Sequence, residues 1–137
     1  MIYGVGTDLV SVVRIEHLML QFQEKFSEKV FTKNEVLQAT KIKVSAENFL
    51  PRALFFAKRF AAKEAFSKAI GLGIGRGIDF QDIEIENDSL GKPKIKILNG
   101  KEIFLKQLMD CKNFAIHLSL TDENPLASAT VIIEKIS

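Results

Sequence analysis

The chain of 137 residues contains one cysteine, two histidines and no tryptophan. The single cysteine, Cys111, excludes a disulfide within the chain and fits a reducing compartment. So few histidine and cysteine side chains argue against a zinc site and against a Cys-His nucleophile pair. The aromatic residues are eleven phenylalanines and one tyrosine. The sequence therefore gives little support for an RNA-binding protein that stacks bases on aromatic side chains.

Strong net charge and long hydrophobic runs are also absent. The net charge of +2 is too small to indicate a nucleic-acid partner by itself. No apolar run approaches the roughly 18 residues of a membrane-spanning helix, and the N-terminal residues lack the pattern of a signal peptide. With 47% hydrophobic and 26% charged residues, the composition predicts one folded domain over residues 1–137 in the cytoplasm, with no membrane or nucleic-acid partner.

The pattern of apolar residues predicts an α+β fold in which a mostly antiparallel sheet packs against a long central helix. Ser11 and a Thr32/Glu35 capping box mark two helix starts, and Gly71 marks the end of the long helix. The expected strands are Ile2–Val10, Asp82–Glu86, Lys94–Leu98, Phe114–Thr121 and Ala127–Lys135. The expected helices are Ser11–Phe22, Glu24–Val30, Thr32–Thr40, Phe49–Ile70 and Gly100–Cys111, and Lys41–Asn48 is predicted to be a flexible connection.

The central helix holds charged residues among alanines and phenylalanines, in the segment RFAAKEAFSKAIG. A buried helix tolerates charges only where they are paired, bind a ligand or reach solvent. Glu64 and Lys68 lie one turn apart, so they either form a stabilising ion pair along the helix or belong to a site. In such a site Glu64 would hold a metal ion or orient a nucleophile, and Lys68 would bind phosphate or protonate a leaving group.

Arg52, Arg59 and Lys63 form a second charged stripe on the same helix. Three cations in line suit a polyanion, but an exposed helix edge explains them equally well. Of these charges, Lys63 has the least defined role, and simple solvation is sufficient to explain it.

Asp8 shares a face of the first strand with Gly4 and Gly6, whose missing side chains leave room for a ligand or another backbone. A carboxylate at that place suits a hard cation such as Mg²⁺. Taken alone, however, Asp8 is better explained as a cap of the helix that begins near Ser11.

Two further features carry weaker signals. The glycine cluster GLGIGRG follows a helix instead of preceding one, so we interpret it as a helix stop and a loop that closes on a ligand rather than as a nucleotide motif. His117 alternates with Ser119 and Thr121 on one face of a strand, and a lone strand histidine is most often structural or solvated.

Four segments carry a stronger signal in combination, and they read GVGTDLVSVVRIE, FFAKRFAAKEAFSKAIGLGIG, FQDIEIENDSLGKP and IHLSLTDENPLASATVIIE. Together they resemble the holo-(acyl carrier protein) synthases, the short single-domain class of phosphopantetheinyl transferases, over essentially the whole chain. The resemblance implies transfer of 4′-phosphopantetheine from coenzyme A to a serine of apo-acyl carrier protein in fatty acid biosynthesis, with release of adenosine 3′,5′-bisphosphate. It also implies a homotrimer with sites at subunit boundaries.

The same resemblance implies roles for individual residues. Asp8 and Glu64 match the residues that hold Mg²⁺ against the coenzyme diphosphate, and Lys68 matches a lysine that contacts phosphate and assists the leaving group. Glu64, directly or through a water, is the candidate to accept the serine proton. The positions matched near the coenzyme are Arg59, Lys68, Gly71, His117, Ser119, Thr121 and Asp122. Some family members have histidine at the position of Asp122 and others have aspartate, so the resemblance does not imply a mechanism that needs histidine there.

The helix Ser11–Phe22 is the predicted dock for the acidic carrier protein, because it combines basic and apolar side chains. The residues concerned are Arg14, Leu18, Met19 and Phe22. Without the resemblance, an ordinary amphipathic helix packed on the core explains them equally well.

Two other functions remain compatible with the residues alone. A Mg²⁺-dependent nucleotide phosphohydrolase would use Asp8 and Glu64 in a similar way and would release phosphate without an acceptor protein. A noncatalytic nucleotide- or RNA-binding module would use Arg52, Arg59 and Lys63, and its binding would depend steeply on salt.

Overall fold

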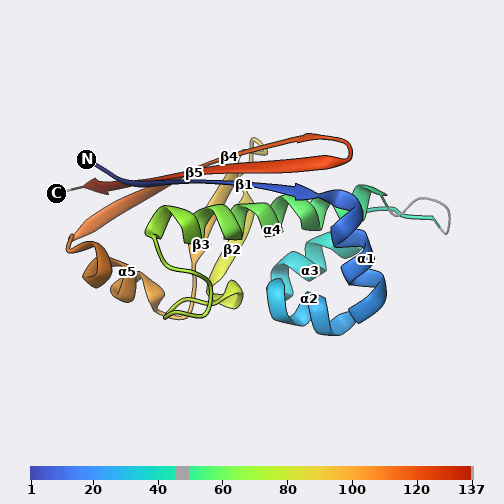
Figure 1. Ribbon diagram of the computed structural model, residues 1–137, viewed down its shortest axis with the longest axis horizontal. Helices are drawn as coiled ribbons and strands as arrows, with labels where there is room; N and C mark the ends of the chain where they lie inside the picture. The colour runs from blue at the N-terminus through green and yellow to red at the C-terminus, as the bar shows by residue number, and fades with distance from the viewer. Residues whose placement is uncertain (46–49, 137) are drawn as a thin grey trace.

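The computed structural model describes residues 1–45 and 50–136 and confirms the α+β architecture. The long helix α4 lies along a three-stranded sheet, and the other helices gather around it (Figure 1). The elements in chain order are β1 (Ile2–Ser11), α1 (Val12–Phe22), α2 (Glu24–Val30), α3 (Lys33–Thr40), α4 (Leu50–Ile70), the 3-10 helix η1 (Phe80–Asp82), β2 (Ile83–Asn87), β3 (Pro93–Ile97), α5 (Lys101–Met109), β4 (Asn113–Glu123) and β5 (Leu126–Ile136).

Most sequence-based boundaries agree with these elements to within two residues. Residues 46–49 lie outside the described residues, so the predicted start of the central helix at Phe49 and part of the predicted connection Lys41–Asn48 are not described. No helix among the described residues combines the length and apolarity that crossing a membrane requires.

The three-stranded sheet has the order β1-β5-β4, with both pairs antiparallel. Its strands alternate between a face packed on α4 and an exposed outer face, as the period-2 pattern predicts. On the inner face, β5 contributes small and branched residues that are buried: Ala127, Ala129, Val131 and Ile133. This face and α4 form the centre of the hydrophobic core.

Gly4 and Gly6 bring β1 unusually close to α4. A Cβ atom on Gly6 would lie 1.9 Å from the carbonyl oxygen of Ala65, and one on Gly4 would lie 1.9 Å from that of Ala69. Both distances are far below van der Waals contact, so only glycine permits this approach. The space cleared by the two glycines is therefore occupied by the helix backbone rather than by a ligand.

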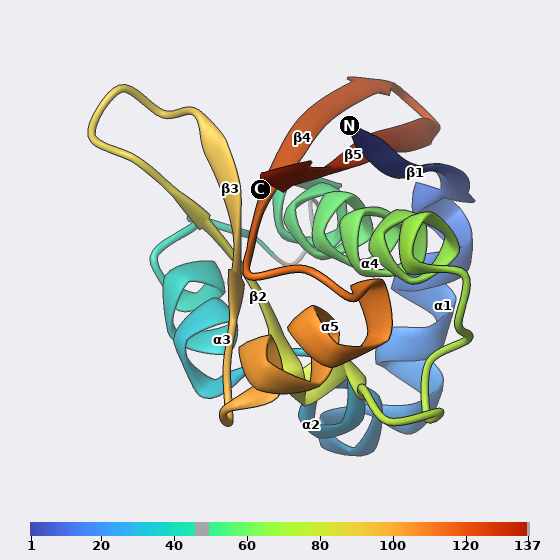
Figure 2. The same cartoon turned by 90° about the vertical axis from the view of Figure 1, so that its left-hand side faces the viewer.

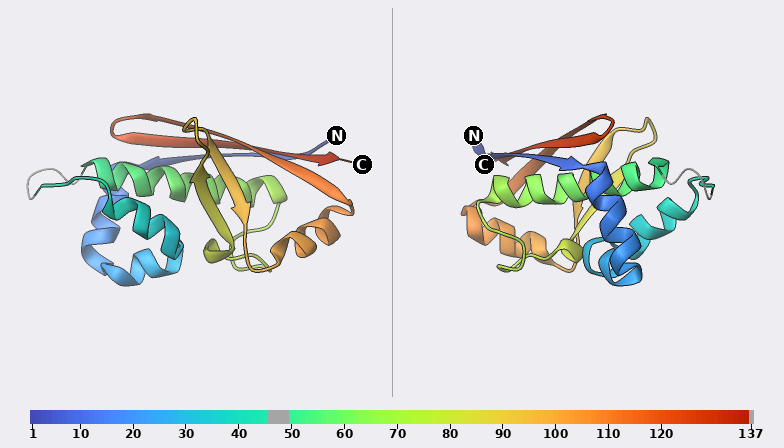
Figure 3. Two further views of the ribbon diagram at one scale, coloured as in Figure 1. Left: turned by 180° about the vertical axis from the view of Figure 1, so that it is seen from behind. Right: turned by 45° about the vertical axis from the view of Figure 1, so that its right-hand side comes forward.

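Helices α1, α2 and α3 cluster beside the N-terminal half of α4, as the right-hand view of Figure 3 shows. Ser11 Oγ accepts a hydrogen bond from the Arg14 N–H at 3.3 Å, so Ser11 caps α1 and the capping interpretation of Asp8 is wrong. The predicted capping box of α3 is confirmed, because Thr32 Oγ1 accepts from the Glu35 N–H at 3.2 Å and Glu35 Oε1 accepts from the Thr32 N–H at 2.9 Å.

The strands β2 and β3 form a separate two-stranded sheet, where the sequence suggested one sheet for the whole chain. The left-hand view of Figure 3 shows the reason: this hairpin crosses α4 steeply, whereas β1, β5 and β4 run along it. Strands at such different angles do not extend a common ladder. The turn of the hairpin projects away from α4 (Figure 2).

Candidate active site

Asp8, Glu64 and Lys68, the predicted catalytic residues, come together where β1 packs against α4. Asp8 lies on the α4-facing side of β1, two residues beyond Gly6, and its side chain is 16% exposed. Lys68 Nζ donates to Asp8 Oδ1 at 3.1 Å and to the Thr7 carbonyl oxygen at 2.9 Å. Lys68 is therefore paired with Asp8 across the contact between strand and helix, and not with Glu64 along the helix.

The carboxyl group of Glu64 is affected by both its burial and its neighbours. Burial raises the pKa of Glu64, and the negative charge of Asp8 raises this pKa further, while Lys68 and Arg14 act in the opposite direction. A carboxylate with a raised pKa accepts a proton more readily near neutral pH than an ordinary glutamate does. The environment of Glu64 thus suits a general base.

Asp8 and Glu64 have the donor chemistry of a magnesium site. Within residues 1–45 and 50–136, no group of three or more His, Cys, Asp or Glu side chains is arranged to hold a metal ion. Mg²⁺ commonly uses only one or two carboxylates and fills its remaining positions with water and phosphate oxygens. Two mutually repelling carboxylates beside a lysine fit such an ion and a phosphorylated ligand.

A cavity of about 720 Å³ opens beside Glu64. The end of α2 forms one of its walls, and the segment from Ile74 through η1 forms another. Its lining holds four carboxylates and one lysine, so the cavity has a negative net charge. The lining residues are Glu28, Lys29, Glu64, Ile74, Gly75, Asp79, Phe80, Gln81 and Asp82.

Gly71, also predicted near the coenzyme, follows Lys68 by three residues in the chain. It follows α4 with a φ of 83°, and its N–H donates to the Ser67 carbonyl oxygen at 3.1 Å. A positive φ is what glycine supplies at a helix end, so the predicted helix stop is confirmed.

The predicted residues of β4 lie elsewhere. His117, Ser119 and Thr121 are exposed on the outer face of the sheet, opposite the face that carries Asp8. His117 Nε2 lies 3.2 Å from Glu134 Oε1. Within a single chain, these three side chains therefore lie away from Glu64.

Asp122 forms an ion pair that the sequence did not indicate. Its Oδ1 lies 2.8 Å from Nζ of Lys58, in the N-terminal half of α4. Lys58 was missed because its partner is 64 positions further along the chain, beyond the reach of any local spacing rule. Asp122 is thus held against α4 but not beside Glu64 and Lys68.

The interpretation of Arg59 and Lys63 as an exposed cationic stripe is wrong. Lys63 is 0% exposed and pairs with Glu35, whereas Arg59 is 7% exposed and stacks on Phe55 with its guanidinium 3.5 Å from the ring centroid. Arg52 is tied to the carbonyl oxygens of Ala39 and Ile42. The stripe faces the helices and the hairpin that cover α4, since a helix packed on several sides has little exposed edge.

Arg59 keeps one property of a ligand-binding residue. Among the described residues, its buried Nε has no hydrogen-bond partner, and the side chain lines a separate cavity of about 370 Å³ with Asn34, Gln38 and Asn87. Burial lowers the pKa of Arg59 to about 10, and Glu35 opposes this shift. Its role toward the coenzyme stays a prediction.

Replacement of Glu64 by glutamine is expected to stabilise the metal-free protein at neutral pH. Because folding raises the pKa of Glu64, the folded state favours its proton, and the wild type loses stability as pH rises through that pKa. Glu64→Gln removes this loss, so its melting temperature in EDTA should exceed that of the wild type at pH 7.5. The gain should shrink as the pH falls toward the ordinary glutamate value of about 4.3.

Calorimetry of both proteins across this pH range tests the expectation. Glu123→Gln, at an exposed strand end, serves as the control and should show no such dependence. A difference that does not change with pH would contradict the assigned environment of Glu64.

Two carboxylates and a lysine, fixed on a helix and a strand beside a cavity, are the parts of an enzyme that transfers a phosphorylated group. The comparison with known sequences specifies that class. The chain belongs to the 4′-phosphopantetheinyl transferase superfamily, whose sequence profile matches residues 4–126.

Relatives and solved structures agree with this assignment. The holo-[acyl-carrier-protein] synthase of Bartonella bacilliformis is 43% identical over 98% of this chain and 96% of its own length. The crystal structure of a holo-(acyl-carrier-protein) synthase from Bacillus anthracis, in complex with CoA (3′,5′-ADP), is 36% identical with a TM-score of 0.79 over 99% of both chains. The Neisseria meningitidis synthase is also 36% identical, with a TM-score of 0.85 over 98% of this chain and 100% of its own.

Proposed function

We propose that this chain is a holo-[acyl-carrier-protein] synthase that transfers 4′-phosphopantetheine from coenzyme A to a serine of apo-acyl carrier protein. The second product is adenosine 3′,5′-bisphosphate, and the reaction belongs to fatty acid biosynthesis in the cytoplasm. The observation that carries the proposal is the convergence of Asp8, Glu64 and Lys68 in a chain of this superfamily. Full-length similarity to synthases, including one solved with the coenzyme, supports the choice of substrates.

The reaction needs one proton acceptor and one cation at the leaving group. The serine Oγ forms a bond to the phosphorus that carries the pantetheine, and the bond from that phosphorus to the bridging oxygen breaks. Glu64 accepts the serine proton, directly or through a water. Lys68 stabilises the negative charge that develops on the departing phosphate.

Asp8 and Glu64 would hold a magnesium ion. When bound, the ion would neutralise charge on the diphosphate oxygens during transfer. Lys68, by pairing with Asp8, holds the carboxylate on the helix side of β1 and so keeps it near Glu64.

The charge of the cavity beside Glu64 favours one orientation of the coenzyme. The net negative lining repels the phosphates of the nucleotide end, and Ile74 and Phe80 add apolar surface. The pantetheine arm is an uncharged chain of amide and methylene groups. We therefore place the arm on the cavity side of Glu64 and the nucleotide on the other side.

We also propose a homotrimer whose sites lie at subunit boundaries. Two observations support it: the predicted coenzyme residues of β4 are remote from Glu64 within one chain, and the outer face of β1 exposes Val5 and Leu9. An apolar sheet face of this kind suits burial against a second copy. Sedimentation should find three chains per particle, and a monomer at the enzyme concentration of the assay would contradict this part of the proposal.

The carrier protein is proposed to dock on α1. Arg14 is exposed and close enough to Glu64 to influence its pKa, and Phe22 is 47% exposed at the other end of the helix. Leu18 and Met19 are half-buried and pack against the core, so they offer only part of their surface. A partner bound along α1 would bring its serine toward Glu64.

Reversal of the charge at Arg14 should weaken carrier binding selectively. Arg14→Glu places a negative charge where an acidic partner binds, and we expect the KM for the carrier to rise about tenfold, which corresponds to about 1.4 kcal/mol. The KM for coenzyme A should change much less. Steady-state kinetics with each substrate varied in turn give both values, and equal increases would argue against docking on α1.

Dependence on the acceptor separates this function from nucleotide hydrolysis. Release of adenosine 3′,5′-bisphosphate from coenzyme A should require apo-carrier protein, because the carrier serine is the nucleophile of the proposed transfer. Equal release without the carrier would favour a phosphohydrolase instead.

A further inference from the structure

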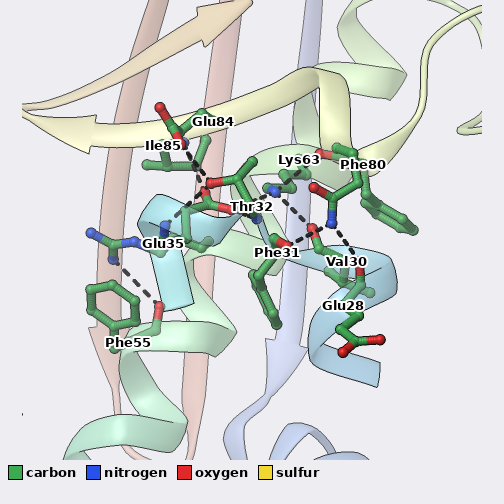
Figure 4. Close-up of polar contacts among 12 residues, drawn as sticks. Glu28, Val30, Phe31, Thr32, Glu35, Phe55, Lys63, Phe80, Glu84 and Ile85 are labelled. Carbon is green, nitrogen blue, oxygen red and sulfur yellow. Dashed lines mark hydrogen bonds and ion pairs between the residues drawn. The ribbon is translucent and has the colours of Figure 1, made fainter. Parts of the chain in front are cut away.

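Lys63 is a fully buried cation whose three donor positions are all used (Figure 4). Its Nζ donates to Glu35 Oε1 at 2.6 Å, to the carbonyl oxygen of Val30 at 2.7 Å and to that of Phe80 at 3.1 Å. An ammonium group has three hydrogens to donate, so these contacts satisfy it completely.

The two carbonyl partners of Lys63 belong to two walls of the cavity beside Glu64. Val30 ends α2, whose residues Glu28 and Lys29 line the cavity, and Phe80 begins η1, which lines it on another side. Lys63 itself directly precedes Glu64 in α4. One side chain therefore joins both walls to the helix that carries the proposed base.

Glu35 fixes Lys63 from the other side. Its Oε1 accepts from Lys63 and from the Thr32 N–H, and its Oε2 accepts from the Ile85 N–H at 2.9 Å. The buried pair thus connects the start of α3, the middle of α4 and strand β2. Its geometry is determined by five elements of the fold (α2, α3, α4, η1 and β2) and not by the two side chains alone.

Stability alone does not explain an ion pair at this place. Well-packed apolar residues of similar volume often replace a buried ion pair without loss of stability. Apolar side chains cannot, however, hold two carbonyl groups at fixed positions relative to Glu64. The ammonium group of Lys63 binds both carbonyl groups and so sets the distance between the α2 wall and the η1 wall of the cavity.

We propose that Lys63 is a positioning residue for the transfer reaction, setting the separation of the α2 and η1 walls so that the group bound between them lies in line with Glu64. This inference rests on the proposed function. Asp8 and Lys68 are held by the contact of β1 with α4 and do not depend on Lys63. Gln81 adds a second link on a less buried side, donating to the carbonyl oxygens of Glu28 and Phe31.

Kinetics of two variants and one matched control test the proposal. Lys63→Met removes the links but leaves the Glu35 carboxylate buried without its partner. The double variant Lys63→Met/Glu35→Gln removes them without an unpaired charge. The glutamine oxygen still accepts from the Thr32 N–H, while the Ile85 N–H loses its acceptor because the amide nitrogen only donates. Thr32→Val is the control: it removes the α3 cap and the hydrogen bond to Glu84 Oε1, and it leaves the contacts of Lys63 intact.

We expect the double variant to lose at least about tenfold in kcat, because misplacement by about 1 Å can cost 10²-fold. Its KM for coenzyme A should stay within about threefold of wild type. Thr32→Val should lose stability but keep kcat within about twofold, when all proteins are assayed well below their melting temperatures. This split distinguishes positioning from a general loss of folded protein.

Two results would overturn the inference: a double variant with a wild-type kcat, or an equal loss of kcat in Thr32→Val. A wild-type protein that transfers nothing to the carrier would instead overturn the proposed function, and this inference with it. If Lys63→Met alone does not fold, the double variant still decides the question.

Discussion

Glu64→Gln should fold normally and lose about 10³-fold or more in turnover. Glutamine has nearly the same size, so the packing between α4 and the cavity is preserved. It cannot accept the serine proton, and it weakens the pair of carboxylates that would hold the magnesium ion. The two losses act on the same step, which makes this the largest expected effect on activity.

Initial rates of carrier modification at increasing Mg²⁺ measure this effect. Glu24→Gln, at an exposed position in α2, is a control of the same chemistry and should retain the wild-type rate. Circular dichroism verifies the fold of both variants. A Glu64→Gln enzyme with wild-type rates at saturating Mg²⁺ would remove Glu64 from the mechanism.

Glu35→Ala should cause the largest loss of stability of any single substitution considered, about 3–5 kcal/mol. The substitution leaves the Lys63 ammonium fully buried without its counter-ion and removes the acceptor of the Ile85 N–H. It also breaks the capping box of α3. Burial already lowers the pKa of Lys63, and Glu35 opposes that shift, so its removal makes the charged lysine still less favourable.

Denaturant unfolding compares Glu35→Ala with the wild type. Glu123→Ala removes an exposed carboxylate from a strand end and should change the free energy of unfolding by less than about 0.5 kcal/mol. A similarly small change for Glu35→Ala would mean that the buried pair contributes little to the fold.

Local sequence signals predicted much of the architecture. The period-2 pattern of the first strand placed Gly4 and Gly6 on the Asp8 face and left room for a ligand or another backbone, and in the structure the backbone of α4 occupies that room. The capping residues and Gly71 allowed the helix ends to be predicted, because the hydrogen bonds that end a helix join residues only a few positions apart in the chain. The site role of Asp8 came from the family resemblance and not from the local pattern, and it stays a prediction.

Ion pairs between residues far apart in the chain could not be predicted from the sequence. The rule for helical neighbours suggested Glu64 as the partner of Lys68, but the structure pairs Lys68 with Asp8, 60 positions away. The same kind of reasoning predicted that Lys63 is exposed to solvent, whereas in the structure its ammonium group is bound by Glu35 and two carbonyl groups. Which side of a helix becomes buried depends on how the other elements pack, and local spacing does not encode that.

The central claim is tested most directly by weighing the carrier protein after reaction. Apo-acyl carrier protein is incubated with this protein, coenzyme A and Mg²⁺, and its intact mass is measured, with Glu64→Gln and EDTA as parallel controls. We predict that the carrier gains the mass of one phosphopantetheine group in the complete reaction only. An unchanged carrier mass, with active wild-type protein and a carrier that a known synthase modifies, would contradict the account.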